Sequence, residues 1–272
     1  MLDRRTSFVQ SIHLSKGAKQ FLIFTFSWSW LSWFTAMKLS NVQGNNLDSF
    51  LYIFGAIAPS SIGLMLAKKE NNPYWANFKK RILSFNGLNI ENLALILGVV
   101  PLLLLVSNIF NYFVYSRIQD TTTLIGYLSD PKSLGLFAVL TFFGGPIMEE
   151  LGWRGYFMDQ LKKSNDLVIS SIFVSLIWVM WHFPLVMLKG SLPYVLVQDS
   201  LVSFIQYNLE IFCYGVILGY ILIRTKFSVL SAILFHFSIN FFMGITRVNS
   251  SFHSSYTILL LFSTLIILDI IN

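Results

Sequence analysis

Long apolar runs dominate this 272-residue chain, and most are close to the length that a helix needs to cross a bilayer. A spanning helix takes roughly 20 mostly apolar residues, because each residue advances about 1.5 Å through a hydrocarbon core about 30 Å thick. Continuous apolar runs in lipid form helices, since the helix bonds its own backbone polar groups. We therefore predict an all-α polytopic membrane protein, a bundle of about eight transmembrane helices. The candidate spans are residues 21–37, 49–67, 91–114, 133–157, 167–188, 201–223, 227–246 and 254–271.

The composition agrees with a membrane protein and excludes several other classes. Hydrophobic residues make up 55% of the chain and charged residues 12%, whereas a soluble domain is about 25% charged. The net charge of +6 comes without a dense basic patch, so nucleic acid is not an expected partner. The single cysteine, Cys213, excludes an intramolecular disulfide and a cysteine-based metal site. No linker or repeat divides the chain, so we expect residues 1–272 to form a single membrane-embedded domain.

Lysine and arginine are unevenly divided between the two sets of alternate connections. The N-terminal tail and the connections after the second, fourth and sixth spans hold 14 of the 19, and the other connections hold five. The positive-inside rule then places both termini in the cytoplasm. No small-residue cleavage site follows the first span, so we expect it to be retained.

Six ionisable or strongly polar residues in the fourth, fifth and seventh apolar runs form a set that could carry chemistry. A charged side chain at the bilayer centre costs about 2.5–3.5 kcal/mol, and such groups usually pair, line a cavity or take part in chemistry. The residues are Glu149, Glu150 and Arg154 in the fourth run, His182 in the fifth, and His236 and Asn240 in the seventh.

Glu149 and His182 are equally far along the chain from a point between Asn165 and Asp166, in the polar turn KKSND. In an antiparallel helical hairpin, residues equidistant from the turn reach about the same depth, here roughly 20–25 Å from it. If both helices are regular, these two side chains can face each other.

His236 and Asn240 are four residues apart and share one helical face. Their stripe continues through small or polar residues, which indicates that it faces protein or a cavity rather than lipid. Glu150 and Arg154 are also four apart, with the acid first, the favoured order for an ion pair on a helix. The stripe comprises Ser228, Ala232, His236, Asn240 and Gly244.

This set of groups predicts hydrolysis by an activated water. A carboxylate at Glu149 beside His182 can serve as a general base. An imidazole at His236 and an amide at Asn240 can donate hydrogen bonds to a developing oxyanion. Glu150 and Arg154 are assigned to charge pairing and support. The prediction involves no covalent intermediate, cofactor or metal.

Three short motifs resemble those of the CPBP intramembrane endopeptidases, the group of CAAX prenyl proteases and bacteriocin-processing enzymes. EELGWR resembles the EExxxR motif, Trp178-x-x-x-His182 the second motif, and His236-x-x-x-Asn240 the last. The resemblance covers about residues 140–245, which we expect to form the catalytic core. It implies an eight-helix glutamate-type protease in which Glu149 and His182 activate water. It also implies a peptide or protein substrate at the membrane, either membrane-associated or lipidated.

Three other functions fit the same groups. A zinc peptidase could use two histidines and a glutamate, although HExxH is absent. A transporter would also place polar groups inside the membrane. A non-catalytic protein of the same fold could act in bacteriocin immunity or as a sensor scaffold. The sequence leaves the substrate and the oligomeric state open.

Overall fold

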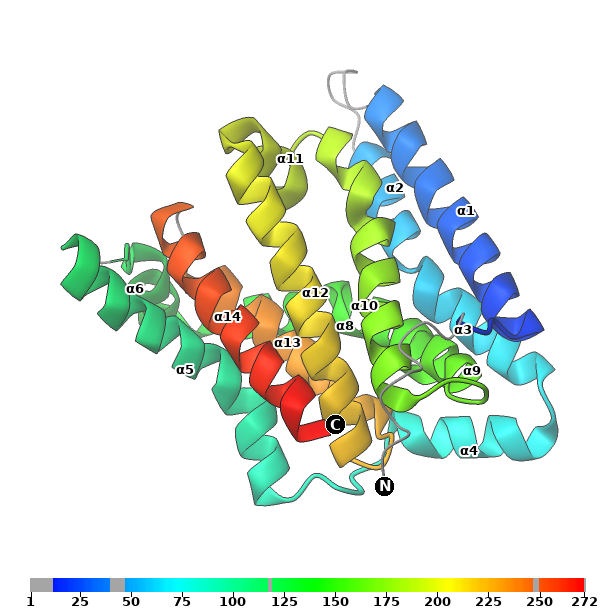
Figure 1. Ribbon diagram of the computed structural model, residues 1–272. Helices are drawn as coiled ribbons and strands as arrows, with labels where there is room; N and C mark the ends of the chain where they lie inside the picture. Colours follow the sequence, from blue (N-terminus) through cyan, green and yellow to red (C-terminus); the bar gives the residue numbers. More distant parts are fainter. Residues whose placement is uncertain (1–11, 40–46, 117–118, 247–249, 272) are drawn as a thin grey trace.

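The computed structural model of the protein describes residues 12–39, 47–116, 119–246 and 250–271, with side chains from 255 onward in the last segment (Figure 1). Within these ranges the secondary structure is entirely helical, so the predicted all-α class is confirmed. Arg4, Arg5 and both terminal residues, Met1 and Asn272, lie outside the described residues. The helices are α1 Lys16–Leu39, α2 Leu47–Ala56, α3 Ala58–Lys69, α4 Asn72–Ile82, α5 Ile90–Tyr115, α6 Thr122–Ser129, α7 Pro131–Gly144, α8 Pro146–Glu150, η1 Leu151–Phe157, α9 Met158–Leu161, α10 Leu167–His182, η2 Phe183–Met187, α11 Leu192–Asp199, α12 Leu201–Arg224, α13 Val229–Thr246 and α14 Ser250–Ile271.

Within the described residues, five helical segments are long and apolar enough to cross a membrane, and a bent pair makes a sixth. The predicted count of eight is therefore approximate. The first predicted span is α1, whose serines and tryptophans lower its mean hydropathy, and the last is α14, which contributes the shorter apolar helix Ser255–Ile271. The five segments are Ile90–Tyr115, Pro131–Leu161, Leu167–Met187, Leu201–Arg224 and Val229–Thr246, and the bent pair is Leu47–Ala56 with Ala58–Lys69, at 41°.

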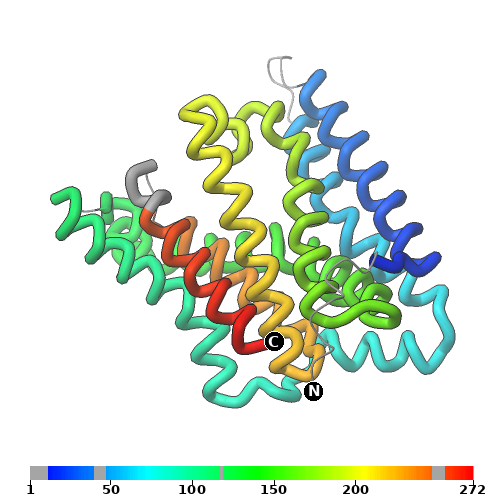
Figure 2. The backbone as a smooth tube through the Cα atoms, in the orientation of Figure 1, coloured from blue at the N-terminus to red at the C-terminus, as the bar shows by residue number. Residues whose placement is uncertain are grey.

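Helices α10 and α12 pack side by side at very short range (Figure 2). A Cβ atom added to Gly215 would lie 2.5 Å from Ser175 Oγ, and one added to Gly219 would lie 2.3 Å from Ser171 Oγ. Gly215 and Gly219 have the GxxxG spacing that permits close helix approach, since any larger residue would push the helices apart. This contact fixes the position of α10.

The segment that carries the two glutamates is held by α3. A Cβ atom on Gly152 would lie 2.2 Å from the carbonyl oxygen of Pro59 and one on Gly63 2.7 Å from Gly152 Cα, so backbone packs directly against backbone. Ser60 Oγ also donates a 2.7 Å hydrogen bond to the carbonyl of Ile147. The space beside Gly152 is therefore filled by protein.

Helices α4 and α9 and the C-terminal end of α12 lie at one end of the bundle (Figure 1), and because these segments carry several basic residues we call it the basic end. Here α4, α9 and the α12–α13 turn are joined through Asp159. Arg81 forms an ion pair with Asp159 and also donates to the carbonyl of Phe227, at 3.4 Å. Tyr74 donates to Asp159 at 2.9 Å, and burial together with this carboxylate raises the pKa of Tyr74 far above its ordinary value. The basic residues at this end are Lys79, Lys80, Arg81, Lys162, Lys163, Arg224 and Lys226.

Candidate active site

Glu149 and Glu150 lie between two irregularities of the fourth predicted span. Helix α7 ends at Gly144, and α8 begins at Pro146, where proline has no N–H to continue the helical ladder. Directly after Glu150, the backbone widens into a π-helix, η1, an element that is frequent at functional sites. Both glutamates are buried.

Glu150 is the centre of a buried charge network. Its Oε1 accepts a 3.0 Å hydrogen bond from Arg154 Nη1, so the ion pair predicted from their spacing is present. The same oxygen lies 2.8 Å from Nδ1 of His236, on α13. Arg154 is itself buried. Because a buried charge is costly without a partner, Glu150 and Arg154 stabilise each other while Glu150 holds the imidazole.

Glu149 and His182 are joined through Trp178. The indole N–H of Trp178 donates a 2.7 Å hydrogen bond to Glu149 Oε2. One helical turn later, His182 Nδ1 lies 2.8 Å from the carbonyl oxygen of Trp178 and can only donate to it. In a neutral ring, this leaves Nε2 of His182 as the proton acceptor.

Among the described residues, no hydrogen bond joins Glu149 directly to His182. The turn between their helices lies where the sequence predicted it, ending at Asp166, which caps α10. The π-helix η1 is wider than an α-helix and advances less per residue. Glu149 therefore lies nearer the turn than a regular helix would place it, at the depth of Trp178 rather than of His182.

His236 and Asn240 converge on the break at Gly145. A Cβ atom added to Gly145 would lie 2.8 Å from Asn240 Nδ2 and 3.8 Å from His236 Nε2. Because Nδ1 of His236 is engaged with Glu150, Nε2 is the ring nitrogen that faces the break. For Nε2 to donate, the Glu150–His236 pair must hold two protons, one shared between them and one on Nε2.

Trp178 contacts almost every member of the site. Its ring lies 4.5 Å from the guanidinium carbon of Arg154, and its centroid is 5.4 Å from the ring of His236 and 5.5 Å from that of His182. Sequence reasoning identified this aromatic residue through the spacing to His182 but did not identify its N–H as a donor to Glu149. The hydrogen bond from Trp178 to Glu149 depends on the position of α8 along the bundle, and the π-helix η1 changes that position.

The geometry adds no support for metal binding by the site residues. In the part of the chain that the structure describes, no three His, Cys, Asp or Glu side chains are arranged to hold a metal ion.

Comparisons with known proteins agree with the motifs. The family described as "Type II CAAX prenyl endopeptidase Rce1-like" matches residues 131–242, a range that includes all six predicted site residues. The chain is also 26% identical over 224 residues to CAAX prenyl protease 2 of Methanococcus maripaludis, covering 82% of each chain. The resemblance to these membrane endopeptidases is therefore confirmed over the segment that carries the three motifs.

Proposed function

We propose that this protein is an intramembrane endopeptidase that hydrolyses a peptide bond with a water activated by Glu149. The observation that carries the proposal is the convergence of three helices on one site. Trp178 contacts all three residues. Its indole N–H donates to Glu149 on α8, its carbonyl accepts from His182 on α10, and its ring lies against the ring of His236 on α13. The Rce1-like match supports a CAAX prenyl endopeptidase as the enzyme class.

Glu149 and His182 are the residues that activate the water in this proposal. Only one oxygen of Glu149, Oε2, is engaged by Trp178, so Oε1 is available to a water. The unprotonated Nε2 of His182 provides a second acceptor, because Nδ1 donates to the backbone. A water held between these acceptors would lose its proton to Glu149 as its oxygen attacks the peptide carbonyl.

His236 and Asn240 are proposed to stabilise the oxyanion. Their Nε2 and Nδ2 atoms both lie beside Gly145, where the absent side chain leaves space. Two fixed donors aimed at one point stabilise charge that develops in the transition state more than they stabilise the ground state. Glu150 and Arg154 keep the His236 ring in place.

The proposed substrate is a membrane-associated or lipidated peptide or protein. The relative named above is called a CAAX prenyl protease. A CAAX segment is a C-terminal Cys-a-a-X sequence whose cysteine carries a prenyl chain. A prenyl chain partitions into the bilayer, where the enzyme's apolar spans also lie. The lipid and the protein would therefore meet in the membrane.

The basic end is proposed to face the cytoplasm. Lysine and arginine near membrane spans favour the cytoplasmic side. The chain just before α1 also lies there, since the N–H of His13 donates to Asn165 Oδ1 at 2.9 Å in the α9–α10 turn. This would put both termini in the cytoplasm.

The proposal is tested with purified protein in liposomes and lipidated peptides ending in three residues after the cysteine, read by mass spectrometry. We expect cleavage that depends on the lipid and continues after exhaustive chelation. Loss of cleavage on chelation would favour a zinc enzyme. Absence of cleavage of any peptide would instead favour the non-catalytic alternative, a binding role in bacteriocin immunity or sensing.

A further inference from the structure

Helix α4 lies across the basic end of the bundle, at a steep angle to α10 and α12 (Figure 1). Its two sides differ in character. Phe78 and Arg81 are buried against the bundle, whereas Lys79 and Lys80 are exposed. A helix that lies across the end of a membrane bundle, with lysines on its outer side, is typical of a segment at the bilayer surface.

The buried side of α4 holds the helix in a fixed position. Arg81 forms an ion pair with Asp159. A Cβ atom added to Gly155 would lie 3.1 Å from Cζ of Phe78, so the Phe78 ring packs directly against the backbone of η1. Because these contacts fix α4, the two exposed lysines are presented to a partner without a large cost of ordering.

Large apolar side chains follow the lysines and are exposed. Leu83 is 73% exposed, Phe85 76% and Ile90 80%. Ile90 is the first residue of α5, which is long and apolar enough to cross the membrane. These apolar side chains therefore lie where the chain enters the bilayer, and they continue the apolar surface of the span. An exposed apolar patch rimmed by charged residues marks a membrane or protein interaction site.

One face of α4 carries the groups that a membrane–water interface accommodates. Trp75, Lys79 and Leu83 are four residues apart and share this face. The Nζ atom of Lys79 lies 5.3 Å from the centroid of the Trp75 ring. Tryptophan is enriched at the interface, and lysine can lay its aliphatic stem along apolar groups while its ammonium stays at the headgroups.

The positive charge of this segment is not balanced within the protein. Between Glu70 and Glu91 the sequence holds three basic residues and no acidic one. Both glutamates have other partners, since Glu70 accepts hydrogen bonds from two side chains of η1 and α9, and Glu91 lies 3.9 Å from Arg224. Among the described residues, neither Lys79 nor Lys80 forms an ion pair. Two neighbouring ammonium groups without a carboxylate favour an anionic partner.

We propose that this surface binds the anionic lipid headgroups of the bilayer at the basic end. The lipid phosphates would pair with the two ammonium groups, while the apolar side chains insert beside the acyl chains. The inference does not depend on the proposed catalytic activity. It agrees with a basic end that faces the cytoplasm, because anionic lipids are concentrated in the cytoplasmic leaflet. We call this the α4 surface, and its members are Trp75, Lys79, Lys80, Leu83, Phe85 and Ile90.

The test measures lipid binding to the purified full-length protein in detergent by native mass spectrometry, with phosphatidylglycerol as the anionic lipid and phosphatidylcholine as the zwitterionic one. We expect wild type to prefer phosphatidylglycerol, and high salt to weaken that preference. The double substitution Lys79→Gln and Lys80→Gln should lower the affinity for phosphatidylglycerol about 10- to 30-fold, because each basic residue near an anionic surface contributes roughly fivefold. The affinity for phosphatidylcholine should stay the same.

Two matched variants separate this site from a general effect of charge. Lys38→Gln with Lys132→Gln removes the same charge from two exposed lysines outside the α4 surface and should leave the preference unchanged. Lys79→Arg with Lys80→Arg keeps the charge and should retain the wild-type affinity.

The proposal would be overturned if wild type bound the two lipids equally, or if the α4 variant and the Lys38/Lys132 control lost the same affinity. Soluble polyglutamate is the probe for the competing partner, an acidic protein segment. Binding of polyglutamate at the α4 surface without a preference for phosphatidylglycerol would assign the surface to such a protein and would also overturn the proposal.

Discussion

Trp178 holds the Glu149 carboxylate through a 2.7 Å hydrogen bond while its ring supports Arg154. Trp178→Phe removes the N–H and keeps an aromatic ring beneath the guanidinium. A hydrogen bond to a charged group contributes about 1.5–3 kcal/mol, so we expect kcat to fall roughly 10- to 100-fold. Because the peptide does not touch the indole N–H in this account, KM should change by less than about threefold.

Trp30→Phe is the matched control for that substitution. Trp30 also donates its indole N–H, to the carbonyl of Trp181 at 3.2 Å, but it does not contact Glu149. We expect nearly full activity from Trp30→Phe. Equal kcat for the two variants would show that the bond from Trp178 has no part in catalysis.

The break between α7 and α8 determines how closely α13 can approach the glutamates. At Gly145 an added Cβ would lie 2.8 Å from Asn240 Nδ2, whereas at neighbouring Gly144 it meets no atom within 4 Å. Gly145→Ala should therefore displace the amide and lower kcat/KM by about tenfold or more, with the protein still folded. Gly144→Ala should leave activity unchanged. Peptide cleavage rates measure the activity of the two variants, and thermal unfolding in detergent shows whether they are folded. Equal loss of activity in the two variants would argue against an oxyanion site at the break.

The contact between α10 and α12 keeps Trp178 and His182 at their depth. Gly219→Ala brings a methyl group against Ser171 Oγ, 2.3 Å away, and overpacking of this kind costs about 1–3 kcal/mol. Adding Ser171→Gly removes the opposing side chain and should restore part of the free energy of unfolding. The recovery should be smaller by about 1 kcal/mol, because glycine is unfavourable inside a helix. Unfolding in detergent of the single and double variants measures the coupling. No recovery in the double variant would mean that the two residues do not limit the approach of the helices.

At the level of elements, the sequence predicted what depends on local pattern. The turn ending at Asp166 and the Glu150–Arg154 pair follow from spacing, and both are present. The hydrogen bond from Trp178 to Glu149 was not predicted, and nothing in the sequence LGWRGYF indicates a π-helix. Gly152, inside this π-helix, packs against Pro59 on α3, a tertiary contact that local sequence pattern does not reveal.

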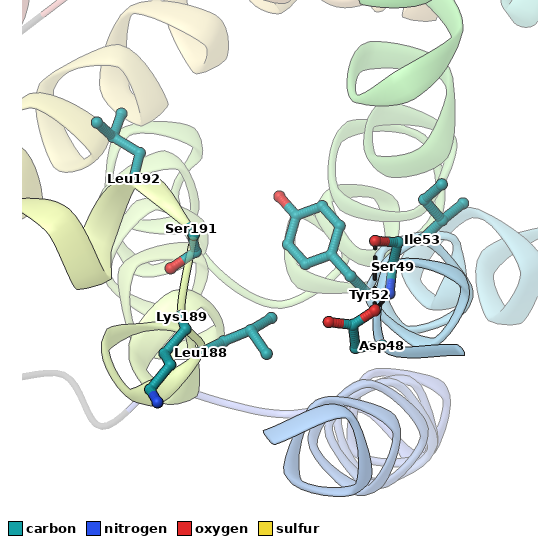
Figure 3. Close-up of a pocket in the computed structure, with 9 residues that line it drawn as sticks. Asp48, Ser49, Tyr52, Ile53, Leu188, Lys189, Ser191 and Leu192 are labelled. Carbon is teal, nitrogen blue, oxygen red and sulfur yellow. Dashed lines mark hydrogen bonds between the residues drawn. The ribbon is translucent and has the colours of Figure 1, made fainter. Parts of the chain in front are cut away.

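At the level of the whole molecule, the gathering of basic residues at one end agrees with the division of charge counted from the sequence. A cavity of about 420 Å³, lined by residues of α2 and of the η2–α11 connection, lies at the other end of α10 (Figure 3), and the sequence held no signal for it. Cavities form where elements distant in the chain fail to touch, here α2 and the η2–α11 connection. Their presence requires the tertiary structure.

Orientation can be tested with single cysteines. In a Cys213→Ser background, Ser164→Cys probes the basic end and Gln198→Cys probes the end near α11, both at exposed positions. With a membrane-impermeant maleimide on intact cells, we expect Gln198→Cys to be labelled and Ser164→Cys to be protected until the cells are opened. The reverse pattern would place the basic end outside the cytoplasm and would contradict the positive-inside assignment, leaving the site chemistry unaffected.

The most direct test of the account compares Glu149→Gln with Glu210→Gln. Glu210 is also a buried glutamate, on α12, and accepts a 2.7 Å hydrogen bond from Thr257. In liposomes with a cleavable lipidated peptide, Glu149→Gln should lower kcat about 10²- to 10⁴-fold while still binding the peptide, because the amide cannot take a proton from water. Glu210→Gln should retain kcat within about threefold. Cleavage by Glu149→Gln at the wild-type rate would contradict the central claim that Glu149 activates the water.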